Sequence, residues 1–159
     1  PPLRGVDLIF FDLEDSGQSG DAAGYCLGSR HLATTWQDFG SPLVGGEPAA
    51  LILLDMVGGK GLAIGQEGYS LQLAPDLVAA VFTRAASLGL RQFVARPTAA
   101  IYDDHAPFLE AGIPSVDLIG LPYRQWHTLG DVPEACDLAS LEAVGRLMTS
   151  LCYQPLEGF

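Results

Sequence analysis

Stretches of apolar residues recur along the chain with two kinds of spacing, one typical of strands and the other of helices. Residues 6 to 11, VDLIFF, are dominated by apolar and aromatic side chains and predict a strand that is buried on both faces. A second run, ALILLDM at residues 50 to 56, repeats this pattern and contains Asp55 near its end. The predicted strands are 6–11, 50–56, 62–64, 93–95 and 116–121.

Between these runs, apolar residues fall at helical spacing. The clearest helix begins at Pro75, a residue suited to the first helical turn, and ends before Gly89. The predicted helices are 25–36, 75–88, 105–111 and 138–151. Strands that alternate with helices indicate an α/β fold, in which helices cover both faces of a parallel or mixed sheet. No linker or repeat divides the sequence, so we expect a single domain over residues 1–159.

Composition narrows the classes of function. Nineteen acids against eight Lys and Arg give a net charge of −11, so the chain lacks the basic stripe that neutralises phosphates, and no nucleic acid partner is expected. The longest apolar stretches are of strand length, short of the ~20 residues that span a bilayer, so no membrane span is expected either. Three cysteines without CxxC spacing indicate neither a disulfide framework nor a thiolate zinc site, although one pair could bridge in an oxidising compartment.

Acids and a histidine lie where predicted strands end. Because ligands of open α/β sheets bind beyond the carboxyl ends of the strands, we expect Glu14, Asp15, Asp55, Asp103 and His127 to converge at one edge. Each acid taken singly has a simpler interpretation as a helix cap or a turn residue. The prediction of a functional site therefore depends on all five residues lying together.

The adjacent acids Glu14 and Asp15 favour a metal site. Neighbouring carboxylates repel unless a cation or a shared proton compensates, and a divalent metal does this while one acid stays free as a base. His127 would add the nitrogen ligand that zinc accepts. His31 has polar neighbours and is expected at the surface, whereas His105 is expected to donate a hydrogen bond to one of the two acids that precede it.

Five ordered motifs resemble those of glutaminyl-peptide cyclotransferases and their M28 zinc aminopeptidase relatives. They are FFDLEDSG (10–17), YCLGSRHLA (25–33), LLDMVG (53–58), YDDHAPFLEAGIP (102–114) and QWHTLGD (125–131). The resemblance covers nearly the whole chain. It implies a three-layer α/β/α fold with a mixed, mostly parallel sheet, as in zinc exopeptidases, with one zinc in the cyclases and two metals in the aminopeptidases.

Position by position, the resemblance implies roles for the acids. Glu14 matches the general acid/base, and Asp15 and His127 match metal ligands. Asp55 matches an acid that binds the second metal in aminopeptidases and lies nearby without a metal in cyclases.

Two further positions favour the cyclase. Asp103 matches the cyclase acid that hydrogen-bonds near the substrate, and Trp126 matches the tryptophan of the substrate pocket. The implied substrate is a peptide with N-terminal glutamine, whose α-amine attacks its own side-chain amide to give pyroglutamate and ammonia while Glu14 moves the proton. In the aminopeptidase alternative, Glu14 would activate a water molecule.

The family has an earlier metal-binding motif that this sequence lacks, so the chain resembles the C-terminal half of the catalytic domain, with the N-terminal part missing. Asp15 and His127 are two ligands, one fewer than the three protein ligands of a usual catalytic zinc site. A third hypothesis is therefore a catalytically silent fragment or self-associating scaffold, with a second copy or a complementing N-terminal half as partner. The resemblance implies an extracellular or periplasmic location.

Overall fold

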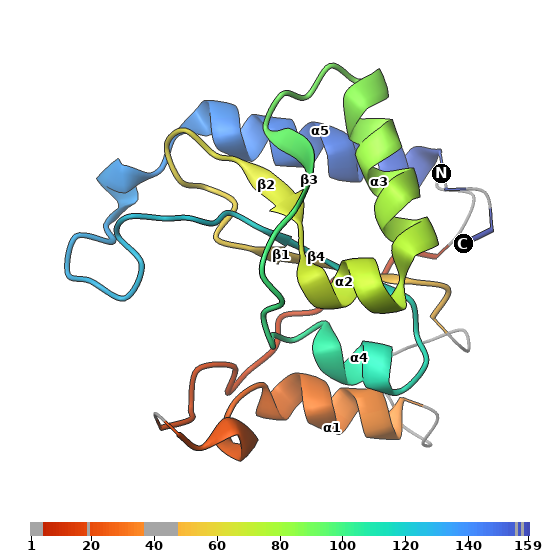
Figure 1. Ribbon diagram of the computed structural model, residues 1–159, viewed down its shortest axis with the longest axis vertical. Helices are drawn as coiled ribbons and strands as arrows, with labels where there is room; N and C mark the ends of the chain where they lie inside the picture. Colours follow the sequence, from red (N-terminus) through yellow and green to blue (C-terminus); the bar gives the residue numbers. More distant parts are fainter. Residues whose placement is uncertain (1–4, 19, 37–47, 155, 157) are drawn as a thin grey trace.

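The computed structural model describes residues 5–18, 20–36, 48–154, 156 and 158–159. Strands and helices alternate through most of this length (Figure 1). The strands are β1 (Leu51–Asp55), β2 (Ile64–Gln66), β3 (Phe93–Pro97) and β4 (Ser115–Ile119). The helices are α1 (Leu27–Thr35), α2 (Gly68–Leu73), α3 (Pro75–Ser87), α4 (Ala106–Glu110) and α5 (Leu138–Tyr153), with short 3₁₀ turns at Ala22–Gly24 and Pro133–Ala135.

The strands form two parallel pairs. β1 pairs with β4 in a register that places Leu51 beside Ser115 and Asp55 beside Ile119, and β2 pairs with β3. β4 also contacts β2, and every residue of β4 is buried. The predicted α/β class with parallel strands is confirmed, and the carboxyl ends of β1 and β4 coincide.

Two clusters of apolar side chains hold the helices against the strands. The larger cluster joins β2 and β4 to α3 and α5 through residues such as Val81, Leu118 and Leu147. The smaller one joins α1 and α4 through Leu32 and Phe108, and Leu51 of β1 packs against it. In Figure 1, α3 and α5 accordingly lie on one side of the strands, and α1 and α4 on the other.

The predicted strand at residues 6–11 is wrong for this chain. These residues form no strand, and Leu8 and Phe10 are 84% and 95% exposed. Only Phe11 packs inward, against Phe108 with ring centroids 5.8 Å apart. The apolar pattern describes side chains suited to burial, but a strand also needs a hydrogen-bonded neighbour, and the described residues provide none for this segment.

Other element boundaries also differ from the sequence-based prediction. The short strand expected at 62–64 lies at 64–66 instead. Residues Gly68–Leu73, which lie outside the predicted helices, form a separate helix, α2, because the Glu67 side chain caps the N–H groups of Tyr69 and Ser70. Among the described residues, no helix combines the length and apolar character that crossing a membrane requires.

Candidate metal and acid–base site

The acidic segment 12–14 is held by the start of α1. The backbone N–H groups of Cys26, Leu27 and Gly28 donate to the carbonyl oxygens of Glu14, Leu13 and Asp12, at 2.8, 3.1 and 3.2 Å. These three consecutive hydrogen bonds fix the backbone that carries the acids. Asp12 contributes to the site through its carbonyl oxygen, which accepts one of them.

Glu14 meets Asp103 and Cys26. Single ligand atoms of these three side chains all lie within 4.8 Å of one another, with Cys26 and Asp103 buried and Glu14 exposed. The cysteine was not expected here, because nothing in its sequence neighbours marks it. The contact becomes visible only when α1 and the segment before α4 are brought together.

The surroundings of Glu14 make it a candidate acid/base. Partial burial, followed by the negative charges of Asp103, Asp15, Asp104 and Asp55, raises the pKa of Glu14 to about 7. A carboxyl group with a pKa near neutrality can both accept and return a proton at physiological pH.

Asp55 belongs to the same group of acids. It ends β1, where burial and the charge of Asp103 raise its pKa to about 6; a hydrogen bond with Asp103 adds to this rise, and one from the Met56 N–H opposes it. Met56 itself has a left-handed backbone, with φ at +50°. For a non-glycine residue this conformation is strained, and strained residues cluster at functional sites.

His127 and Asp15 form the solvent-facing part of the site. His127 Nε2 lies 4.0 Å from Asp15 Oδ2, with both side chains more than half exposed. The Trp126 and His127 rings lie against each other, with centroids 4.6 Å apart and planes tilted by 39°. Trp126 is 53% exposed, so it is no core residue, and His127 has φ at +54°.

This pair suits a metal ion. Zinc accepts imidazole nitrogen and carboxylate oxygen as ligands, so these two side chains would be the ones to hold such an ion. The donor set is chemically right for zinc, and a further ligand would complete it.

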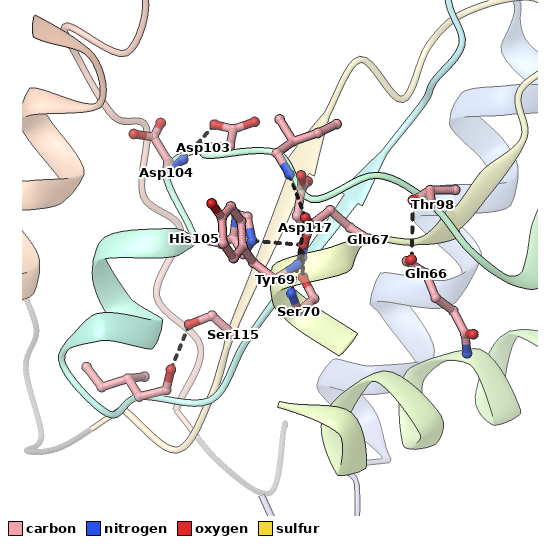
Figure 2. Close-up of polar contacts among 12 residues, drawn as sticks. Gln66, Glu67, Tyr69, Ser70, Thr98, Asp103, Asp104, His105, Ser115 and Asp117 are labelled. Atoms are coloured by element: carbon pink, nitrogen blue, oxygen red, sulfur yellow. Dashed lines mark hydrogen bonds and ion pairs between the residues drawn. The ribbon is translucent and has the colours of Figure 1, made fainter. Parts of the chain in front are cut away.

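His105 has a different partner from the one expected. Instead of Asp103 or Asp104, its Nε2 meets Oε2 of the buried Glu67, 3.1 Å away (Figure 2). Asp104 in turn accepts a 2.5 Å hydrogen bond from the Ser29 hydroxyl. Sequence reasoning missed Glu67 because it ends no apolar run. The local signal that could have pointed to it is the neighbouring Gly68, which permits close approach of another backbone segment. His31 is exposed on α1, as predicted.

Asp117 was also overlooked. It lies in the middle of β4 with no exposed surface, and among the described residues neither of its carboxyl oxygens has a hydrogen-bond partner. Burial, and then the charges of Asp103, Asp55 and Glu67, raise its pKa to about 9. In the sequence, Asp117 is an acid inside the apolar run at residues 116–119, and this is the signal that could have revealed it.

Comparisons with known proteins identify the family of the chain. The chain matches peptidase family M28 over residues 1–152. It is 28% identical to glutaminyl-peptide cyclotransferase of Drosophila melanogaster, over 89% of this chain and 44% of the fly protein.

Two solved structures are similar. Porphyromonas gingivalis glutaminyl cyclase is 36% identical with a TM-score of 0.77, over 87% of this chain and 50% of that one. A leucine aminopeptidase precursor from Bacteroides thetaiotaomicron is 30% identical with a TM-score of 0.81, over 91% and 51%.

The fold and its carboxylate-rich edge thus define an α/β protein of the zinc-exopeptidase-like class. The chain belongs to peptidase family M28. It spans about half the length of the relatives it matches.

Proposed function

We propose that this chain carries the acid–base residues of a glutaminyl-peptide cyclotransferase. The observation that carries the proposal is Glu14, an acid with a pKa of about 7 that lies near the Asp103 carboxyl and directly precedes Asp15, the partner of His127. The sequence Asp-Asp-His at residues 103–105 and the Trp126–His127 ring contact favour a cyclase, as does the similarity to the P. gingivalis enzyme.

The reaction would join the α-amine of a peptide to the side-chain carbonyl carbon of its own N-terminal glutamine. The new C–N bond forms as the old amide C–N bond breaks, and ammonia leaves. Glu14 would take a proton from the attacking amine and give it to the departing nitrogen. Asp55 and Asp103 would keep the pKa of Glu14 high enough for both transfers, and Trp126 would line the substrate pocket.

Asp15 and His127 would hold one zinc ion, which when bound supplies a Lewis acid for the substrate carbonyl. The third protein ligand would come from the part of the family's length that this chain does not span. By the same resemblance we place the protein outside the cytoplasm, extracellular or periplasmic; recovery of the native protein only from the cytoplasmic fraction would refute this location.

The test is release of ammonia from peptides with N-terminal glutamine, with and without added zinc. Glu14→Gln should abolish the release while zinc remains bound, and the matched Asp76→Asn variant, at the exposed start of α3, should behave like the parent chain. An active Glu14→Gln variant would remove Glu14 from the mechanism.

A second candidate is an aminopeptidase, favoured by the similarity to the B. thetaiotaomicron aminopeptidase precursor. Asp55 would then bind a second metal, and Glu14 would activate water. Cleavage of aminoacyl anilides without reaction of Gln-peptides, together with two bound metal ions, would establish this alternative. Absence of both activities and of tight zinc binding would favour a catalytically silent scaffold.

A further inference from the structure

Glu67 is a fully buried carboxylate that receives five hydrogen bonds. The donors are the N–H groups of Tyr69 and Ser70 at 2.9 and 2.7 Å, the Ser70 hydroxyl at 2.8 Å, the Ile101 N–H at 2.8 Å and His105 Nε2 at 3.1 Å (Figure 2). Burial opposes its ionisation, but these hydrogen bonds outweigh burial and lower the pKa of Glu67 to about 2. Glu67 is therefore charged throughout the physiological range.

Two of the five donors lie at opposite ends of one short segment. Ile101 begins the segment 101–105 and His105 ends it, so a single carboxylate holds both ends. The backbone before the segment is docked in the same place, because Gly68 N–H donates to Ala99 O at 3.2 Å. A Cβ at Gly68 would come within 2.6 Å of Ala100 N, so only glycine permits this approach.

The segment held in this way delivers Asp103 to the site. Asp103 is 6% exposed and lies with Glu14 and Cys26 in the three-residue group described above. Its Oδ1 accepts the Asp104 N–H at 2.6 Å, so the side chain is oriented by the backbone of the same segment. Displacement of 101–105 would therefore displace Asp103 relative to Glu14.

We propose that Glu67 is a positioning residue, which sets the geometry of Asp103 by holding segment 101–105 at both ends. The inference rests on the proposed function in so far as Asp103 acts in catalysis there. Capping of α2 alone requires only the Tyr69 and Ser70 N–H groups. The bonds to Ile101 and His105 go beyond that role.

The test is Glu67→Gln, which keeps the size of the side chain. One terminal oxygen becomes an NH₂ group, which cannot accept from a donor, so the five donors can no longer all be satisfied. We expect backbone amide exchange at residues 101–104 to rise at least about tenfold, while α3 and α5 stay protected. We expect kcat for ammonia release to fall about 10- to 100-fold, with KM changed less than about twofold, because misplacement of a catalytic group has effects of this order.

The matched control is Asp137→Asn, since Asp137 caps α5 by accepting the Ser140 N–H at 2.8 Å and makes no bond to segment 101–105. It should change neither exchange at 101–104 nor kcat. Glu67→Gln should also add no further loss of kcat to Asp103→Asn, since both changes would disable the same group. A role confined to stability would instead give independent effects.

Amide exchange and kcat together distinguish a failure of this inference from a failure of the proposed function. If the parent chain releases no ammonia, the proposed function fails, and amide exchange alone decides whether Glu67 holds the segment. Unchanged protection of 101–104 in Glu67→Gln would overturn the inference, as would faster exchange without loss of kcat in an active chain. If Glu67→Gln does not fold, His105→Gln, which alters one end of the segment only, should show the same local exchange, and unchanged protection there would overturn the inference.

Discussion

At the scale of single residues, three carboxylates show how environment decides ionisation. Glu67, with five donors, has its pKa lowered to about 2, whereas Asp117, equally buried but without a hydrogen-bond partner in the described part of the chain, has its pKa raised to about 9. Glu14 has an exposed side chain, but partial desolvation of its carboxyl group and the neighbouring acids place its pKa between these two, at about 7. The number of donors around each carboxylate separates the extremes.

Glu14 should titrate near pH 7 in the metal-free chain, as followed by carbon NMR of its carboxyl group. Asp103→Asn should lower that midpoint, because it removes a negative charge that favours the protonated form. Zinc bound at the neighbouring Asp15 should lower it as well, by adding positive charge. A midpoint near 4.5 in the metal-free chain would contradict the prediction.

Asp117 should make the chain less stable as pH rises. Its pKa is higher in the folded state than in the unfolded state, so between about pH 4 and 9 the unfolded chain binds fewer protons, and the free energy of unfolding falls across this range. Asp117→Asn should remove this part of the pH dependence, which for one proton amounts to at most about 1.4 kcal/mol per pH unit. Denaturant unfolding at pH 5 and pH 8 measures it, with Asp76→Asn as control; an equal slope in Asp117→Asn and the parent chain would refute it.

Sequence reasoning found Glu14, Asp15, Asp55, Asp103 and His127, because acids and a histidine at the ends of apolar runs are visible in one dimension. The structure brings these residues together, although their chemical roles remain predictions. Glu67 could not be found in this way, and Asp117 offers only the signal of an acid inside an apolar run. Their importance depends on burial and on donors from other segments, which local pattern does not encode.

At the scale of elements, the close contact between α1 and segment 12–14 depends on Gly28. A Cβ there would overlap Asp12 Oδ1 and come within 2.6 Å of the Asp12 carbonyl oxygen. Gly28→Ala should therefore displace the acidic segment, lower the free energy of unfolding by about 1–3 kcal/mol and weaken zinc binding.

Gly145→Ala is the matched control for Gly28→Ala, because no atom lies within 4 Å of a Cβ at this position of α5. It should instead stabilise the chain by about 0.5–1 kcal/mol, through better helix propensity. Thermal unfolding and zinc titration of the two variants check both expectations. Equal behaviour of the two variants would show that the contact with Asp12 is unimportant.

Elements with strong local signals were predicted well. α3 begins at Pro75 as expected, and Gly89 follows its end with φ at +69°. β1 lies within the apolar run that predicted it, and β4 overlaps its predicted run 116–121 but begins one residue earlier, at Ser115. Segment 6–11 was predicted wrongly. Its apolar pattern is typical of a strand inside a sheet, but strand pairing also depends on a partner strand elsewhere in the protein.

At the scale of the whole molecule, the exposed apolar side chains of segment 6–11 should promote self-association. Leu8 and Phe10 each expose most of a large apolar side chain, and association would remove this surface from water. The chain should therefore show a concentration-dependent mass by light scattering, and the double change Leu8→Asp and Phe10→Asp should reduce it. Leu138→Asp, at an exposed position on α5, is the control. A mass independent of concentration in the parent chain would contradict the scaffold hypothesis.

The parallel pairing of β1 with β4 also affects how the chain folds. Between Asp55 and Ser115 lie β2, α2, α3, β3 and α4, so the central pair closes only when a long stretch of chain has been gathered. Closing such a loop costs entropy before its contacts repay it, and non-local pairing of this kind slows folding. Substitutions in β1 or β4 that leave the finished structure nearly unchanged could thus still lower the yield of folded protein, by prolonging the time for which apolar strands are open to aggregation.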